Sequence, residues 1–337
     1  MIHAYLYIQK DHQDFEAIAS LLATFQESFP HELMVVDLDS EPYLKLAYQE
    51  KAPVLDIGPY RLTAPIQKHD LRFAFIETQK KLKAAQEKGD QLIIERFSQA
   101  PKLSGSDKFS YWFSSHYMLL FNLLVLIYVG LPFLAPVLMK LNLNRPAYVI
   151  YKIYKPLCHQ LAFRSWFLFG EQHVYPRELA GVEDLATYGE VTGNNEFDLT
   201  AARDFTGNQT MGYKVALCER DVAIYGAILL FGLVFSLSGK RIKPIPWYLW
   251  LILGIVPIGL DGFSQLVTQI GFSFLAWFPV RESTPLLRTI TGALFGFFTA
   301  WYGYPYMEES VAESRDQMEN KMALIRQMQR DQRVKLT

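Results

Sequence analysis

Residues 117–138 read Y-M-L-L-F-N-L-L-V-L-I-Y-V-G-L-P-F-L-A-P-V-L, and no Lys, Arg, Asp or Glu lies between His116 and Lys140. A helix of about 20 apolar residues is long enough to cross the ~30 Å hydrocarbon core of a bilayer. The stretch therefore predicts a transmembrane helix. Long apolar runs recur through 116–305, whereas residues 1–110 have the composition of a soluble domain. We therefore expect an integral membrane protein with a soluble N-terminal part.

Three further apolar runs predict the other spans of a four-span helical bundle, at 222–237, 245–260 and 286–304. Residues 146–169 are aromatic, but they include the cations Lys152, Lys155 and Arg164. Three charges inside one span are costly, so this segment predicts an interfacial or re-entrant helix. Residues 171–216 are rich in Gly, Asn, Glu and Asp and predict a polar insertion.

The loop at 239–244 indicates the orientation in the membrane. It contains Lys240, Arg241 and Lys243 and no acidic residue. Short loops with an excess of Lys and Arg face the cytoplasm. With four spans, both termini are then cytoplasmic and the insertion is extracytoplasmic. We expect a protein of the inner membrane of a prokaryotic cell, with membrane lipids as its surroundings.

Four dense polar runs each lie at the end of an apolar segment. They are K-P-L-C-H-Q-L-A-F-R-S at 155–165, L-C-E-R-D at 217–221, D-G-F-S-Q at 261–265 and R-E-S-T-P-L-L-R at 281–288. On the four-span count, all of them fall on the extracytoplasmic side. The sequence therefore predicts one polar site assembled from four separate segments.

Candidate metal ligands in these runs are Cys158, His159, Cys218 and Asp221. Two sulfur, one nitrogen and one oxygen ligand suit a tetrahedral zinc ion. Adjacent residues rarely both reach one ion, so His159 has the alternative role of orienting a ligand. Two other interpretations remain open: a disulfide between the two cysteines, or two buried thiols without a function. Both the zinc and the disulfide interpretations require the two sulfur atoms to lie close together.

The remaining polar side chains predict either catalysis or interhelical ion pairs. Ionisable groups near the membrane interior are costly, so they are usually paired or functional. Asp261 and Glu282 are candidate general bases or partners of a metal-bound water. Arginines among the candidate binding residues could clamp a phosphate or a carboxylate. The candidate binding residues are Gln160, Arg164, Ser165, Arg220, Gln265, Arg281 and Arg288. The alternative is a set of salt bridges that hold the helices together.

The combined motifs C-H-Q-x-x-x-R-S, C-x-R, D-G-x-x-Q, R-E-S-T and L-R-x-x-T-G resemble those of predicted membrane proteins known as domain of unknown function 2085. The resemblance covers about 115–305 and implies a compact helical membrane domain without an established activity. Two positions depart from the family pattern: Asp221 stands where members often have a second cysteine, and Pro285 where many have Asn. The insertion is also longer than the connection in most members.

The first 75 residues resemble a thioredoxin or glutaredoxin fold, with the order β-α-β-α-β-α and a Pro before the third strand. In such domains a C-x-x-C opens the first helix, because the helix N-terminus lowers a thiol pKa. Here those positions read His12-Gln13-Asp14-Phe15, so the domain has no thiol chemistry. The resemblance also implies a cis bond before Pro53. A degenerate redox domain kept for docking and a plain α/β cap both remain open.

The predicted organisation is an α/β thioredoxin-like domain followed by an all-α four-span transmembrane bundle. Its parts are residues 1–78 (thioredoxin-like), 79–110 (charged helix and linker), 111–306 (transmembrane) and 307–337 (charged helical cytoplasmic tail). The net charge is −1 and no basic recognition segment is present, which excludes nucleic acid as a partner.

Two classes of function fit these features. One is a metal-dependent membrane enzyme that acts on an anionic or lipid substrate at the outer interface. The other is a non-enzymatic membrane subunit or scaffold with a structural disulfide or metal site. In that case the N-terminal domain or the tail recruits a protein partner.

Overall fold

The computed structural model describes residues 1–9, 11–40, 42–48, 51–98, 102–270 and 280–336. It divides into two compact units, which we describe separately. The first comprises Met1–Ser115 with Val311–Thr337, and the second comprises His116–Ser310. The expected tail, 307–337, therefore belongs largely with the N-terminal domain. The boundaries fall inside two long helices, α5 (Gly105–Lys140) and α12 (Pro285–Leu336).

The first unit contains a four-stranded mixed sheet with the strand order β2-β1-β3-β4. Strand β1 pairs parallel with β2 and antiparallel with β3, and β3 pairs antiparallel with β4. Its strands and helices are β1 (Ile2–Ile8), α1 (Phe15–Ala23), β2 (His31–Asp37), α2 (Pro42–Tyr48), β3 (Val54–Ile57), β4 (Tyr60–Thr63), α3 (Lys68–Lys88) and α4 (Gln91–Ser98). The sequence predicted three strands and missed β4. The bond between Ala52 and Pro53 is cis, as expected.

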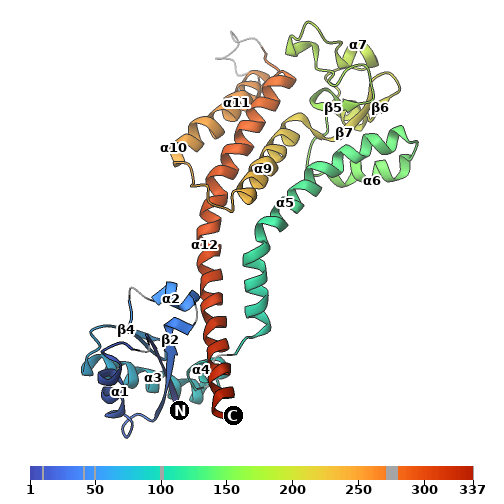
Figure 1. Cartoon of the computed structure of the whole chain (residues 1–337). Coiled ribbons are helices and arrows are strands. Elements are labelled where there is room, and N and C mark those ends of the chain that lie inside the picture. The colour runs from blue at the N-terminus through green and yellow to red at the C-terminus, as the bar shows by residue number, and fades with distance from the viewer. Residues whose placement is uncertain (10, 41, 49–50, 99–101, 271–279, 337) are drawn as a thin grey trace. The chain divides into compact units, whose positions relative to one another are not determined.

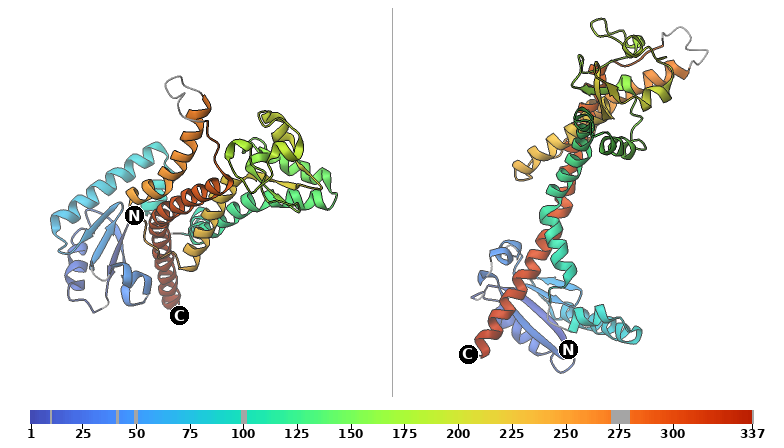
Figure 2. Two further views of the ribbon diagram at one scale, coloured as in Figure 1. Left: turned by 90° about the horizontal axis from the view of Figure 1, so that it is seen from above. Right: turned by 90° about the vertical axis from the view of Figure 1, so that its right-hand side faces the viewer.

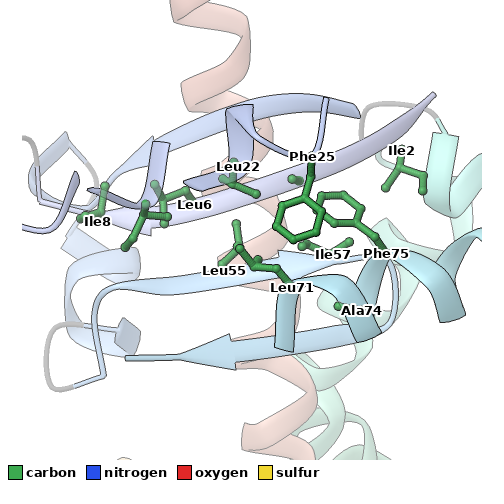
Figure 3. Packing of buried hydrophobic residues seen from close by; sticks show 12 residues of the cluster. Ile2, Leu6, Ile8, Leu22, Phe25, Leu55, Ile57, Leu71, Ala74 and Phe75 are labelled. Atoms are coloured by element: carbon green, nitrogen blue, oxygen red, sulfur yellow. The ribbon is translucent and has the colours of Figure 1, made fainter. Parts of the chain in front are cut away.

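Both faces of this sheet are covered. Alternate residues of a strand point to opposite faces, and Ala4, Leu6 and Ile8 of β1 enter a core with α1 and α3. Figure 3 shows Phe25 and Phe75 at the centre of this core, with ring centroids 5.9 Å apart. The opposite face packs against α2 and the C-terminal part of α12, where Ala323 and Leu324 are buried. Figures 1 and 2 show this part of α12 running along the sheet.

The second unit is mainly helical. Within the described residues, three helical segments are long and apolar enough to cross a membrane: α5, α9 (Glu219–Leu237) and the segment Trp247–Ile270. That last segment comprises α10 (Trp247–Leu249), a π-helical turn (Trp250–Ile255) and α11 (Val256–Ile270). The three overlap the first three predicted spans. The fourth, 286–304, is not confirmed: it forms the start of α12 but is not among the three.

The second unit also contains a small antiparallel sheet, which corrects the all-α prediction. The strand order is β5-β7-β6, with β5 (Ser165–Leu168), β6 (Gly207–Asn208) and β7 (Gly212–Cys218). Segment 146–169 is not one helix, because α6 (Asn144–Tyr154) ends before an irregular stretch that leads into β5. At 1.5 Å per residue, its eleven residues are too short to span a bilayer.

The insertion packs around a core that it shares with residues 161–167. It contains the short helices α7 (Tyr188–Thr192) and α8 (Leu199–Asp204). A capping box closes the start of α7: the Thr187 hydroxyl accepts from the Glu190 backbone, and the Glu190 carboxylate accepts from the Thr187 backbone. Aromatic rings dominate the core, which contains Leu161, Ala162, Phe163, Phe167, Tyr175, Tyr188, Ala202 and Met211.

Helices α9 and α12 approach each other closely at two glycines. A Cβ atom on Gly296 would lie 2.1 Å from the carbonyl oxygen of Ile224, and one on Gly292 would lie 2.8 Å from that of Arg220. Small residues allow two helices to approach this closely. By contrast, no atom lies within 4 Å of the Cβ position at Gly226 or Gly259. Close helix packing thus accounts for Gly292 and Gly296 but not for Gly226 or Gly259.

Candidate functional site

Four consecutive residues at the start of α9 organise the polar site. Strand β7 runs directly into this helix, with Cys218 as the N-cap. Glu219 forms an ion pair with Arg288, and Arg220 forms one with Asp261. Cys218 and Asp221 lie beside Cys158, in the group described next. The run L-C-E-R-D thus contacts each of the other three polar runs.

The first group consists of Cys158, Cys218 and Asp221, whose ligand atoms all lie within 4.8 Å of one another. The predicted proximity of the two sulfurs is therefore confirmed, and both cysteines are free thiols. Cys158 is buried and Cys218 is half-buried. The Cys218 thiol donates to the Cys158 sulfur, which lowers the pKa of Cys158 and raises the pKa of Cys218. His159 is exposed and is not part of the group.

Gln160 fixes the loop that carries Cys158. Its backbone is left-handed, with φ of 53°. Its buried amide Nε2 donates to the carbonyl of Tyr151 at 3.0 Å and to that of Ala216 at 2.9 Å. The carbonyl of Gln160 in turn accepts from Lys214 Nζ at 2.7 Å, and Lys214 also donates to the carbonyl of Arg203 at 2.8 Å. Burial lowers the pKa of Lys214 to about 7. The predicted binding residue Gln160 therefore joins α6 to β7.

Ser165 also makes an internal contact. Its buried hydroxyl donates to the carbonyl of Leu161 at 2.9 Å. Its backbone lies opposite Cys218 in the pairing of β5 with β7. The residue thus holds the small sheet beside the cysteines.

The second group surrounds the buried carboxylate of Glu282. Arg164 donates to both of its oxygens, from Nε at 2.8 Å and from Nη2 at 3.0 Å. Arg288 donates to Oε1, Gln269 donates to Oε2 at 2.9 Å, and Arg177 lies 3.7 Å from Oε2. Three guanidinium groups from different segments therefore converge on one carboxylate.

The third group surrounds Asp261, which is also buried. Arg281 donates to Oδ1 at 3.0 Å, while Arg220 and the Ser283 hydroxyl donate to Oδ2, the latter at 2.9 Å. Gln265 donates to the backbone carbonyl of Asp261 at 3.2 Å. The predicted residues at 261–265 and 281–288 are thus brought together.

Glu219 differs from the other two carboxylates. Its side chain is 1% exposed, and the nearest guanidinium nitrogen, on Arg288, is 3.6 Å away. Among the described residues, neither of its carboxylate oxygens has a hydrogen-bond partner. A buried acceptor without a partner is costly unless water or an ion occupies the site.

Five participants were not predicted from the sequence: Glu219, Ser283, Lys214, Arg177 and Gln269. Glu219 and Ser283 lie inside the quoted polar runs, so their position was an available signal. Lys214 and Arg177 lie within the polar insertion, away from the ends of the long apolar segments that marked the other candidates. Nothing in the sequence pattern distinguishes Arg177 from a surface arginine, although it is only 7% exposed.

Comparison with known proteins agrees with a membrane protein. A family model described as "Predicted membrane protein (DUF2085)" matches residues 207–302. This range holds three of the four polar runs and excludes the one at 155–165. An uncharacterized protein of Methanocaldococcus jannaschii, MJ1492, is 25% identical over 165 residues, which are 48% of this chain and 70% of the relative. No solved structure matches the chain.

Proposed function

We propose that this is a non-enzymatic integral membrane protein, and that its polar cluster holds the insertion, the loops and the membrane helices together. One observation carries this proposal: each carboxylate oxygen of the candidate bases Asp261 and Glu282 accepts a hydrogen bond from an arginine. Ser283 and Gln269 each donate a further hydrogen bond, to Asp261 and to Glu282 respectively. A general base has to lie within hydrogen-bond reach of the proton that it removes, and these side-chain donors would compete with a substrate for the carboxylate oxygens. The arrangement favours ion pairs over proton transfer.

Four spans with both termini in the cytoplasm fit the contacts within the second unit. At the end that holds the basic loop, Lys240 pairs with Glu308 at 3.3 Å and lies 4.6 Å from the ring centroid of Tyr117. At the other end, Arg288 lies in the ion-pair cluster. A helix from 288 to 308 is about 30 Å long, enough to cross the hydrocarbon. The inner membrane of a prokaryotic cell remains our proposed location.

Labelling in intact cells tests this topology. Ser106 and Asn194 are exposed, and they precede and follow the first predicted span in the sequence. With an impermeant thiol reagent, we expect Asn194→Cys to react and Ser106→Cys to be protected until the cells are lysed. The parent chain is the background, since Cys158 is buried and Cys218 is half-buried. Reaction of both introduced cysteines from the same side would refute the orientation.

For the first unit, we propose a thioredoxin-like domain that has lost its thiols and docks a protein partner. Its strand order and the helix that begins at Phe15 support this assignment. The positions before and at that helix start carry His12 and Phe15 in place of thiols. The C-terminal part of α12, packed on the same sheet, is the second candidate docking element.

A metal-dependent enzyme acting on an anionic or lipid substrate is the second candidate. The group formed by Cys158, Cys218 and Asp221 favours it, because catalytic zinc sites have three protein ligands and an open position. Such an enzyme would need a base other than Asp261 or Glu282, or would need their arginine contacts to break.

The variant Asp261→Asn distinguishes the two candidates. If the carboxylate is structural, we expect the loss of its charge beside Arg220 and Arg281 to lower the free energy of unfolding in detergent by about 2 kcal/mol. Glu183→Gln is the matched control, since Glu183 is exposed in the same unit. Residues that serve catalysis often contribute nothing to the free energy of unfolding, or lower it. An unchanged or raised stability in Asp261→Asn would therefore favour the enzyme.

A further inference from the structure

We propose that Cys158, Cys218 and Asp221 form a zinc-binding site. This inference goes beyond the scaffold function, because a structural ion is compatible with either candidate function. Cys158 and Cys218 are 60 positions apart in the sequence, yet their sulfurs lie close to each other and to the carboxylate of Asp221. Each side chain offers one ligand atom, and no two of these atoms are more than 4.8 Å apart. A single ion can therefore contact all three.

Independent contacts hold the ligands in place. Cys158 follows α6, and its backbone N–H donates to the carbonyl of Tyr154 at 3.0 Å. Cys218 ends β7, and Asp221 lies in the first turn of α9. The amide of Gln160 links the Cys158 loop to β7 through two hydrogen bonds. A preorganised site of this kind loses little entropy when an ion binds.

The ligand chemistry selects zinc among the common ions. Calcium and magnesium prefer oxygen ligands throughout, and copper(I) prefers thiolate or thioether ligands, so a carboxylate disfavours it. Zinc accepts sulfur and oxygen together in tetrahedral geometry. With Zn–S bonds near 2.3 Å, two sulfurs on one tetrahedral zinc lie about 3.8 Å apart. That separation fits within the 4.8 Å span of the group.

Charge and proton balance are consistent with the assignment. When Zn²⁺ binds, both thiols release a proton to solvent, so two thiolates and one carboxylate give a site of net charge −1. Lys214, whose Nζ donates to the carbonyl of Gln160 at 2.7 Å, can supply compensating positive charge in its protonated form. His159 is exposed and outside the group, so the fourth coordination position is left to water or to another small ligand.

Metal analysis of the full-length chain in detergent, purified under reducing conditions with zinc in the medium, tests the site. We expect about one zinc per chain in the parent, and a loss of at least about fivefold in Cys158→Ser, Cys218→Ser and Asp221→Asn. His159→Ala is the matched control and should retain its zinc. Size-exclusion chromatography checks that each variant is folded.

A second readout keeps the test valid if a serine variant fails to fold. Cobalt(II) loaded into the metal-free parent should give sulfur-to-cobalt charge-transfer absorption and the intense visible bands of a tetrahedral site. Asp221→Asn keeps both sulfurs and should change the visible bands. A parent chain with two free thiols and no zinc would overturn the proposal. Two oxidised cysteines without added oxidant, shown by mass, would overturn it in favour of a disulfide.

Discussion

We expect Glu282→Gln to lower the free energy of unfolding in detergent by about 3–5 kcal/mol, because it leaves buried guanidinium groups without their counter-charge. Arg288 is 3% exposed and Arg177 is 7% exposed, so neither can recover its hydration where it stands. The Gln amide also presents N–H donors toward groups that only donate. Equilibrium unfolding in mixed detergent micelles measures the loss.

Glu178→Gln is a suitable control for this variant. Glu178 lies in the same unit, is exposed, and its backbone rather than its carboxylate makes the recorded hydrogen bonds. We expect its stability to stay within about 0.5 kcal/mol of the parent. A loss in Glu282→Gln no larger than in this control would show that the ion pairs between Glu282 and its arginines do not stabilise the fold.

Gly296→Leu separates α9 from α12. Any side chain at this position begins 2.1 Å from the carbonyl oxygen of Ile224, which is backbone and cannot rotate away. Overpacking of this kind costs about 3 kcal/mol or more, and far outweighs the gain in helix propensity from removing a glycine. We expect a strong fall in the thermal midpoint in detergent.

Gly259→Leu tests whether the effect is specific to this contact. Gly259 lies on α11, is exposed, and has no atom within 4 Å of its Cβ position. The same substitution there should leave the thermal midpoint unchanged or slightly higher, since Leu is the better helix former. Equal losses at Gly296 and Gly259 would contradict close packing between α9 and α12.

The apolar runs predict the three candidate spans well, because a continuous run of about 20 apolar residues matches the thickness of the hydrocarbon core. The fourth run is less distinct, since Arg288 and several polar residues interrupt it and the helix continues to Leu336. Strand β4 and the sheet β5-β7-β6 were missed because strands of two to seven residues give weak local signals. Their pairing depends on distant segments that local propensity does not report.

Most residues of the candidate site could be predicted from the sequence, but the contacts between them could not. The four polar runs do meet, which followed from placing them at the same ends of the spans. Adjacent residues point in different directions, however, so Cys158 is buried beside Cys218 while His159 faces solvent. For Asp261 and Glu282 the sequence left catalysis and interhelical ion pairs both open, and only the three-dimensional structure reveals which arginines pair with the two carboxylates.

In the proposed function, Arg164 and Glu282 stabilise the fold by contacting each other. A double-mutant cycle with Arg164→Met, Glu282→Met and the double variant measures this contact in the free energy of unfolding. We predict a coupling energy of about 1.5–3 kcal/mol, so that the double variant loses less than the sum of the two single variants. Additive losses, within about 0.5 kcal/mol, would contradict a structural ion-pair network at this site.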